Sequence, residues 1–240
     1  MKALIFDCDG VLVDTERDGH RVAFNQAFKK NKIDAEWDVE RYGELLKVAG
    51  GKERMKHFFE EYGWPENIAD KGSLIKSLHA DKTELFMKII ESGELAVRPG
   101  IKRIVDEAIE EGITLAVCST SNEKAVRAVV HHLLGPGREV KFAGIFAGDI
   151  VAKKKPDPAV YNLAKDELSL DPKDCMVIED SRNGLLAATQ AGMSCVVTTS
   201  TYTTEEDFTE ADQVVPELGD DPARVTLADL HQIVQKKNNA

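Results

Sequence analysis

ALIFDCDG, residues 3–10, is the stretch of this chain that decides its fold. Its first four residues form a short apolar run, which is typical of a buried β-strand. Asp7 and Asp9 follow directly, with Cys8 between them. Successive side chains of a strand point to opposite faces, so the two aspartates are expected on one side and Cys8 on the other. The sequence therefore begins with a predicted strand that ends in a pair of carboxylates.

Further apolar runs recur along the chain, and segments with helical spacing separate them. The runs are residues 114–118, 144–147, 176–178, 195–197 and 213–215. Helices are expected from about Asn122 and after Pro158, and the last helix is expected at the capping-box pattern Thr226–Asp229. Strands that alternate with helices predict an α/β fold, a doubly wound parallel sheet with helices on both faces.

One long segment, residues 16–95, contains no strand candidate. Its apolar residues follow helical spacing, as in the i, i+3, i+4, i+7 pattern that starts at Met55. We therefore expect an all-helical cap domain over residues 16–95. It would be inserted into a discontinuous α/β core domain formed by residues 1–15 and 96–240.

The composition excludes several classes of protein. The chain has 240 residues, and 42 acidic residues against 31 Lys and Arg give a net charge of −11. This balance argues against nucleic acid or an anionic membrane as the main partner, and no apolar run reaches membrane-spanning length. The N-terminus does not resemble a signal peptide. The four cysteines are dispersed and lie in or beside apolar runs, so we expect reduced packing residues in a reducing compartment.

Polar residues that suit phosphate and metal chemistry follow several of the predicted strands. Glu179 and Asp180 end one run, while Ser119, Thr120, Ser121 and Asn122 end another at the start of a helix. Ligands bind at the carboxyl ends of the strands in such a sheet. Carboxylate oxygens suit Mg²⁺, and hydroxyl and N–H groups at a helix start favour phosphate. Lys155, which is followed by Pro156 and Pro158, adds positive charge.

Each of these features has an ordinary structural explanation when taken singly, such as a helix cap or a solvated charge. Together they are what phosphoryl transfer needs. One aspartate can act as nucleophile and form an aspartyl-phosphate. The other can protonate the leaving oxygen and then activate water. A metal ion, a lysine and hydroxyl donors offset the charge on the transferring oxygens.

The same motifs resemble a known superfamily. DCDGV at residues 7–11, Ser119, Lys155-Pro156 and Glu179-Asp180-Ser181 are similar to the four motifs of the haloacid dehalogenase superfamily of phosphatases, and the helical insert resembles its first cap type. Longer stretches resemble the CbbY-type sugar-bisphosphatases, whose substrate is xylulose 1,5-bisphosphate. These stretches are VDTERDGHR, YGELLKVAGGKERM, VCSTSNEKAV and AGDIVAKKKPDPAVYNLA. The resemblance covers about residues 2–215 and leaves the last ~25 residues without an assignment.

The resemblance implies roles for the core residues. Asp7 would be the nucleophile and Asp9 the general acid/base, while Ser119 and Lys155 would contact the transferred phosphate. The side chains of Asp7 and Asp180 and the backbone carbonyl of Asp9 would hold Mg²⁺, with Glu179 as a possible further ligand. Arg182 could reach substrate or face water, and the sequence does not decide between these.

The resemblance also implies substrate contacts from residues 119–122 and from the cap. The cap residues are Glu16, His20, Gly50, Gly51, Lys52, Glu53 and Arg54. His20 stands one residue farther from the acidic motif than in many relatives. Independently, two glycines let backbone approach a ligand, and Lys52 and Arg54 can bind a second phosphate; a solvated helix start is the ordinary alternative. The other five histidines are interpreted as structural or surface residues.

The function implied is a Mg²⁺-dependent sugar-bisphosphate phosphatase that removes an inhibitory sugar phosphate of carbon fixation. Three alternatives stay open: a β-phosphoglucomutase-like mutase, a phosphoglycolate phosphatase and, from a different class, a receiver-type signalling domain. The receiver reading conflicts with Asp9 and with the helical insert. We expect a monomer with a phosphosugar as its partner, in bacterial cytosol or in the chloroplast stroma if the source is a plant or alga.

Overall fold

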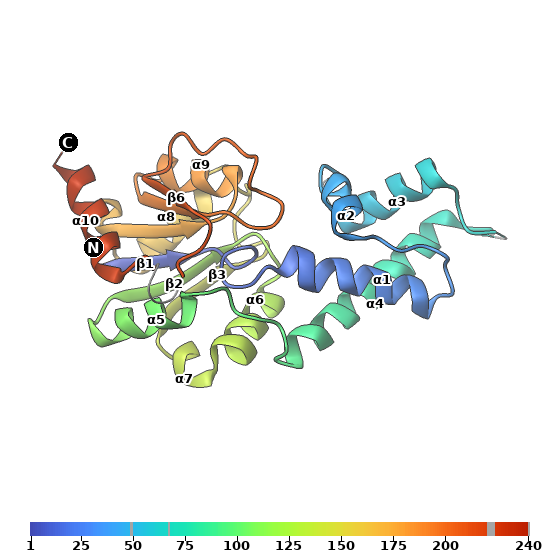
Figure 1. The fold of residues 1–240 in the computed structure, drawn as a ribbon, viewed down its shortest axis with the longest axis horizontal. Coiled ribbons are helices and arrows are strands. Elements are labelled where there is room, and N and C mark those ends of the chain that lie inside the picture. Colours follow the sequence, from blue (N-terminus) through green and yellow to red (C-terminus); the bar gives the residue numbers. More distant parts are fainter. Residues whose placement is uncertain (49, 67, 220–223, 240) are drawn as a thin grey trace. The chain divides into compact units, whose positions relative to one another are not determined.

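The structure is a computed structural model that describes residues 1–48, 50–66, 68–219 and 224–239. The chain divides into two compact units, one formed by residues 1–14 and 96–240 and the other by residues 15–95 (Figure 1). The first is an α/β unit and the second is helical. None of the described helices is long and apolar enough to cross a membrane.

The α/β unit is built on one sheet whose strands are all parallel. The strand order is β3-β2-β1-β4-β5-β6, so β1 lies in the middle, between β2 and β4. The strands are β1 (Ala3–Phe6), β2 (Thr114–Ser119), β3 (Phe142–Ala147), β4 (Cys175–Glu179), β5 (Ser194–Thr198) and β6 (Gln213–Val215). This arrangement confirms the predicted doubly wound α/β fold, and it gathers the carboxyl ends of the strands along one edge.

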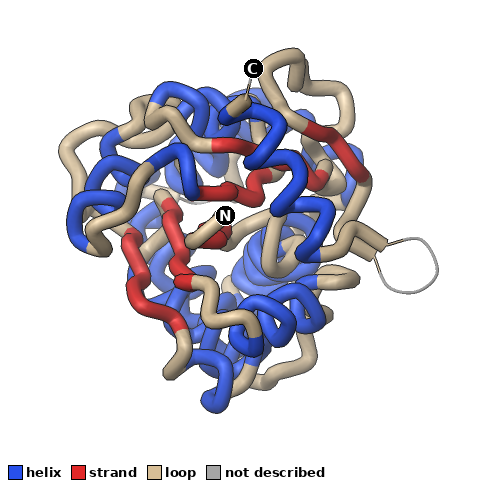
Figure 2. The backbone as a smooth tube through the Cα atoms, turned by 90° about the vertical axis from the view of Figure 1, so that its left-hand side faces the viewer, coloured by secondary structure: helices blue, strands red, loops and turns tan. Residues whose placement is uncertain are grey.

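Helices surround the sheet (Figure 2). They are α5 (Ile101–Glu110), α6 (Glu123–Val129), α7 (Pro136–Glu139), α8 (Ala159–Glu167), α9 (Arg182–Gln190) and α10 (Leu227–Asn238). A π-helical turn, Val130–Leu134, follows α6, and a 3-10 turn, Pro172–Asp174, precedes β4. Helix α10 begins at the predicted capping box, in which Thr226 and Asp229 bond each other's backbone N–H groups.

The sheet is apolar on both faces, as a parallel sheet covered by helices must be. On one face, Ala3 and Ile5 of β1 belong to a buried cluster with Val160 of α8 and Leu185 of α9. Helices α5 and α10 contact each other and pack on strands of the same sheet without entering that cluster. All four cysteines are free and buried in this unit, as the sequence predicts for packing residues.

The helical unit contains no strand among its described residues. It begins with a π-helical turn, Glu16–His20, and continues with α1 (Arg21–Lys30), α2 (Val39–Leu45), α3 (Gly51–Tyr62) and α4 (Lys71–Glu91). Its core is aromatic: Trp37 lies 4.8 Å from Phe24 and 5.0 Å from Phe28 between ring centroids. Buried aromatic rings contribute most to the packing of so small a core.

The π-helical turn bears on the position of His20. A π turn accommodates one more residue than an α turn, and such turns often occur at functional sites. Gly19 in this turn is buried, and a Cβ there would lie 2.7 Å from the ring of Phe86. The absence of a side chain at Gly19 therefore lets the turn pack tightly on α4.

Candidate active site

The predicted acidic residues lie at the carboxyl ends of neighbouring strands. Asp7 directly follows β1, Glu179 is the last residue of β4, and Asp180 follows it. Because β1 and β4 are adjacent, carboxylate oxygens of these three residues all lie within 4.8 Å of one another. All three side chains are buried. Carboxylates this close repel one another unless a cation or proton lies between them, so the cluster is a candidate cation site.

Lys155 supplies one positive charge to this cluster. Its Nζ donates to Asp7 Oδ1 at 2.7 Å, to Glu179 Oε1 at 2.6 Å and to the backbone carbonyl of Cys118 at 2.8 Å. These acceptors match the three donors of an ammonium group. The Lys155 side chain is only 7% exposed. The sequence suggested a lysine near the site, and the structure shows Lys155 fixed between Asp7, the candidate nucleophile, and Glu179 of the acidic pair.

One lysine does not neutralise three carboxylates. Burial, with repulsion from Glu179 and Asp9, raises the pKa of Asp7 to about 7, although Lys155 acts in the opposite direction. Burial and repulsion from Glu179 and Asp7 hold the pKa of Asp180 well above its usual range. Burial alone would lower the pKa of Lys155, but the two carboxylates outweigh it and raise that pKa. An all-oxygen cluster with excess negative charge fits a hard divalent cation such as Mg²⁺.

The segment after β2 contacts the second aspartate of the first motif. The Ser121 hydroxyl donates to a carboxylate oxygen of Asp9, and the Ser121 N–H donates to Ser119 Oγ at 3.1 Å. Ser119 is buried. Asn122 caps α6, since its Oδ1 accepts from the N–H of Lys124 at 3.0 Å. The structure therefore brings Asp9 and Ser121 together and shows Asn122 as the cap of α6, while its contact with substrate stays a prediction.

A hollow opens beside this segment, at the carboxyl ends of β2 and β3. Its volume is about 500 Å³, and Thr120, Asn122, Gly148 and Ile150 are among the residues that line it. A hollow of this size beside a candidate phosphate-binding segment can accept part of a small phosphorylated molecule.

Glu179 is more deeply enclosed than the sequence could tell. Its side chain is fully buried, and Oε1 accepts from the Tyr161 hydroxyl at 2.6 Å as well as from Lys155. Oε2 accepts from the N–H of Asp180 at 3.1 Å. A Cβ on Gly184 would lie 1.9 Å from the Glu179 carboxyl carbon, so α9 must have glycine there. Glu179 is thus held in one place by Tyr161, Lys155 and α9.

Arg182 is paired with acidic residues of a neighbouring loop. Its Nη2 donates to Glu210 at 2.8 Å and its Nη1 donates to the carbonyl of Asp207 at 2.6 Å. These partners lie in the loop between β5 and β6. Arg182 therefore ties α9 to that loop.

In the helical unit, two of the predicted residues are joined through a third. Tyr42 donates its hydroxyl proton to Glu16 Oε2 at 2.6 Å and accepts from Nη1 of Arg54 at 2.8 Å. Nε of Arg54 also donates to the carbonyl of Leu45 at 3.1 Å. Arg54 is only 8% exposed, which is uncommon for an arginine. The network fixes the guanidinium of Arg54 and links it through Tyr42 to Glu16.

His20 has a second buried cation as its neighbour. Lys82 Nζ lies 2.9 Å from His20 Nδ1, and the Lys82 side chain is buried beside the rings of Phe24 and Phe86. Burial, together with the charges of Lys82 and Arg54, holds the pKa of His20 well below its usual range. An ammonium group only donates, so Nδ1 is the acceptor and the neutral ring carries its proton on Nε2.

The cap loop predicted at residues 50–54 is instead the start of a helix, since Gly50 is the N-cap of α3 and residues 51–54 form its first turn. Lys52 and Glu53 are exposed, whereas Arg54 is buried. Gly50 has a φ of +89°, and a Cβ there would lie 2.3 Å from a carboxylate oxygen of Glu53. Gly51 packs beside Phe24. The structure therefore brings Arg54 together with Glu16 and leaves Lys52 at the surface.

Three residues of these networks were missed by the sequence analysis: Tyr42, Lys82 and Tyr161. For Lys82 a signal exists, because it lies on the buried stripe of α4 with Ile75, Leu78, Phe86 and Ile90. A lysine at helical spacing within an apolar stripe is costly unless it has a partner. The two tyrosines carry no such signal, since a tyrosine among apolar residues is ordinary in a core.

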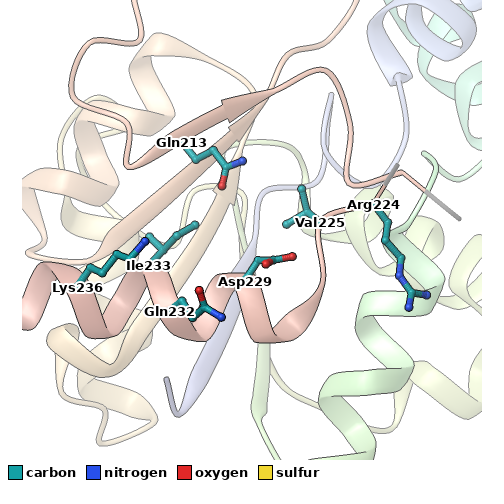
Figure 3. A pocket seen from close by; sticks show the side chains of 7 residues that line it. All are labelled: Gln213, Arg224, Val225, Asp229, Gln232, Ile233 and Lys236. Atoms are coloured by element: carbon teal, nitrogen blue, oxygen red, sulfur yellow. The ribbon is translucent and has the colours of Figure 1, made fainter. Parts of the chain in front are cut away.

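A second hollow of about 320 Å³ lies between β6 and α10 (Figure 3). Gln213, the first residue of β6, lines it together with Gln232, Ile233 and Lys236 of α10. Because the strands are parallel, this hollow lies toward their amino ends, at the opposite edge of the sheet from Asp7. It has no part in the chemistry of the acidic cluster.

A lysine-bound aspartate at the end of a central strand of such a sheet, with a second aspartate two residues later, is the arrangement of a class of hydrolases. The family model for haloacid dehalogenase-like hydrolases matches residues 1–192. The chain therefore belongs to the haloacid dehalogenase-like hydrolases, and it is a phosphatase of the CbbY-like group within them.

The relatives support this placement over the whole chain. A CBBY-like protein of Arabidopsis thaliana is 55% identical over 240 residues, which cover 98% of this chain and 75% of that protein. The crystal structure of CbbY from Rhodobacter sphaeroides in complex with phosphate has a TM-score of 0.79 at 40% identity, covering 96% of this chain and 99% of that one. A mutant of the same protein in complex with xylulose 1,5-bisphosphate has a TM-score of 0.78 at 40% identity, with the same coverage.

Proposed function

We propose that this protein is a Mg²⁺-dependent phosphatase of a sugar bisphosphate, namely xylulose 1,5-bisphosphate, and that it acts through an aspartyl-phosphate on Asp7. The observation that carries the proposal is the position of Asp7, which Lys155 holds at 2.7 Å beside Glu179 and Asp180. In carbon fixation such an enzyme would remove an inhibitory sugar phosphate.

The donor set supports a metal ion of the proposed kind. The side chains of Asp7 and Asp180 and the backbone carbonyl of Asp9 would hold Mg²⁺, and Glu179 is close enough to contribute. When bound, the ion would offset negative charge on the transferring phosphoryl oxygens. The raised pKa values of Asp7 and Asp180 support this assignment, because added positive charge keeps both groups ionised.

The steps of the reaction fall to residues of the α/β unit. A carboxylate oxygen of Asp7 attacks phosphorus, and the bond from phosphorus to the sugar oxygen breaks. Asp9 gives its proton to that leaving oxygen. Lys155 and the Ser119 hydroxyl contact the phosphoryl oxygens and balance their charge. Asp9 then takes a proton from water, which attacks phosphorus, so that inorganic phosphate leaves and Asp7 is restored.

Selectivity for a bisphosphate would come from the helical unit. Arg54 and Lys82 are cations buried in an aromatic core, and neutral His20 presents an N–H at Nε2. Such donors suit a phosphate, and buried charge acts more strongly than charge in water. The xylulose 1,5-bisphosphate complex of the Rhodobacter sphaeroides relative supports this choice of substrate. Relatives described as β-phosphoglucomutases are only 21–23% identical and share the fold alone.

The test is Mg²⁺-dependent phosphate release from four substrates: xylulose 1,5-bisphosphate, ribulose 1,5-bisphosphate, β-glucose 1-phosphate and phosphoglycolate. Asp7→Asn serves as the blank. We expect release from the xylulose compound in preference to the others. Release from phosphoglycolate alone would contradict the bisphosphate assignment and keep the chemistry of Asp7. Isomerisation of β-glucose 1-phosphate without release would indicate a mutase.

A further inference from the structure

Arg98 joins three separate segments of the α/β unit. Its guanidinium donates to the backbone carbonyls of Gly10, Thr198, Thr199 and Pro216, the last two at 2.7 and 2.6 Å. The backbone N–H of Arg98 donates to the carbonyl of Leu12 at 2.9 Å. One side chain therefore connects the turn that follows β1 with the segments that follow β5 and β6.

The first of these segments carries catalytic residues of the proposed reaction. Gly10 follows Asp9 directly, and its φ of +78° is one that glycine adopts readily. A Cβ on Gly10 would lie 1.9 Å from Oδ2 of Asp180, so backbone and carboxylate are in direct contact there. The carbonyl that Arg98 binds is one peptide unit away from the Asp9 carbonyl. Holding it therefore fixes the tilt of the turn that presents the Asp9 carbonyl.

The second segment reaches the same carboxylate from the β5 side. Thr198 and Thr199 precede Ser200, whose side chain hydrogen-bonds the Asp180 carboxyl. The Thr198 hydroxyl also donates to the carbonyl of Glu179 at 3.4 Å. Asp180 thus lies between two segments that Arg98 holds together: the Asp9–Gly10 turn and the loop after β5.

We propose that Arg98 is the positioning residue of the metal site, because it sets the spacing between the Asp9 carbonyl and the Asp180 carboxylate. This inference rests on the proposed function, in which both groups hold Mg²⁺. A guanidinium presents several N–H groups in a rigid planar fork, whereas a lysine ammonium is a single point on a flexible stem. Lysine at position 98 would keep the charge and lose the simultaneous hold on both segments. Groups that orient metal ligands contribute strongly to metal affinity.

The chain offers a matched control in Arg103. Its guanidinium also donates to three backbone carbonyls of the α/β unit, those of Leu218, Gly219 and Val225, at 3.3, 2.8 and 2.9 Å. None of these carbonyls belongs to the segments that contact Asp180. Replacing Arg103 therefore removes a comparable set of hydrogen bonds without touching the metal site.

The experiment measures Mg²⁺ binding by isothermal titration calorimetry in wild type, Arg98→Lys, Arg98→Met and Arg103→Met, each first freed of metal with a chelator. The urea midpoint of each variant is measured alongside. Arg98→Lys and Arg98→Met should bind Mg²⁺ about 10- to 100-fold more weakly than wild type. Arg103→Met should bind it with wild-type affinity even where its urea midpoint falls. Excess Mg²⁺ should restore much of the phosphatase rate to the Arg98 variants.

The possible outcomes distinguish a failure of the role of Arg98 from a failure of the proposed function. Equal Mg²⁺ affinity in the Arg98 and Arg103 variants would overturn the role of Arg98 and leave the proposed function intact. A wild-type protein that binds no Mg²⁺ would overturn the proposed function and this inference with it. If Arg98→Met does not fold, Arg98→Lys carries the same comparison with Arg103→Met.

Discussion

The two units of the molecule each contain a network of charged side chains around a tyrosine: the first is rich in buried carboxylates, and the second contains buried cations. In the α/β unit, Tyr161 donates to Glu179 at 2.6 Å, and three carboxylates share Lys155. In the helical unit, Tyr42 donates to Glu16, also at 2.6 Å, in a network with the cation Arg54, and the buried cation Lys82 lies beside His20. A tyrosine thus donates to a carboxylate in both units, among further carboxylates in the α/β unit and beside cations in the helical unit.

The difference indicates what each unit is suited to bind. Burying charge without compensation is costly, so a buried excess of one sign favours a ligand of the other sign. The excess of carboxylates at the ends of β1 and β4 favours a metal cation. The buried Arg54 and Lys82 favour an anion. Variants can test each unit separately.

The largest effect is expected from Asp7→Asn. The amide cannot form the aspartyl-phosphate, so phosphate release should fall to the level of the blank without enzyme. The substitution is nearly isosteric, and circular dichroism should show an unchanged fold. Retained turnover of any substrate in the panel would contradict the role of Asp7 as nucleophile. It would also contradict the assignment of the reaction to the α/β unit.

Removing a buried cation from the helical unit should affect substrates unequally. Arg54→Ala and Lys82→Met should each lower kcat/KM for xylulose 1,5-bisphosphate by about 10- to 100-fold, the loss expected for a hydrogen bond to a charged group. Hydrolysis of p-nitrophenyl phosphate, which has no second phosphate, should change little. Lys56→Met is the control, because Lys56 is exposed on the same helix as Arg54 and is not predicted to contact substrate. Equal losses on both substrates would show that the network supports folding rather than selection of a bisphosphate.

Burial of Asp7 in the α/β unit should make the metal-free protein less stable as pH rises. The pKa of Asp7 is raised from 3.8 to about 7, mainly by burial, so the folded state keeps a proton that the unfolded chain loses. The free energy of unfolding should therefore fall between pH ~4 and ~7, by on the order of 1–3 kcal/mol. Urea denaturation in chelator, with Asp7→Asn as the reference, measures this contribution. A wild type that gains stability relative to Asp7→Asn over this range would contradict the assignment.

The smallest effects compare the two tyrosines. Tyr161→Phe removes one hydrogen bond to the buried carboxylate of Glu179 and Tyr42→Phe one to the half-buried carboxylate of Glu16, each at a cost of about 1 kcal/mol in stability. Tyr161→Phe should lower kcat a few-fold on every substrate, because Glu179 helps to hold Lys155. Tyr42→Phe should instead raise KM for the bisphosphate alone. Steady-state kinetics on both substrates separates these patterns, and an identical pattern in both variants would argue against the division of roles.

Much of the α/β unit could be predicted from the sequence, because several of its candidate catalytic and metal-binding residues lie at the ends of apolar runs. Asp7, Ser119 and Glu179 are placed by the ends of their strands, and parallel pairing brings those ends together. The partners behind them were not predictable. Tyr161 reaches Glu179 from α8, 18 residues away in sequence, and no local pattern marks that contact.

The helical unit was harder to predict, since helix packing rather than strand order places its polar groups. The resemblance to relatives indicated Arg54 and Lys52 together, but spacing on α3 buries the first and exposes the second. No periodicity in the sequence indicates the π-helical turn that contains Glu16 and His20. Lys82 is the exception, because its place within an apolar stripe could have revealed it.

The most direct test of the account is to trap the phosphoryl group. In Asp9→Asn the acid/base that activates water is missing, so phosphate transferred to Asp7 should hydrolyse slowly. The variant is mixed with Mg²⁺ and p-nitrophenyl phosphate, whose leaving group departs without a proton from Asp9, and is then quenched in acid and digested for mass spectrometry. We predict that the peptide containing Asp7 gains the mass of one phosphoryl group in Asp9→Asn, and that Asp7→Asn gains none. Phosphate release without any modified peptide, or modification at another residue, would contradict the account.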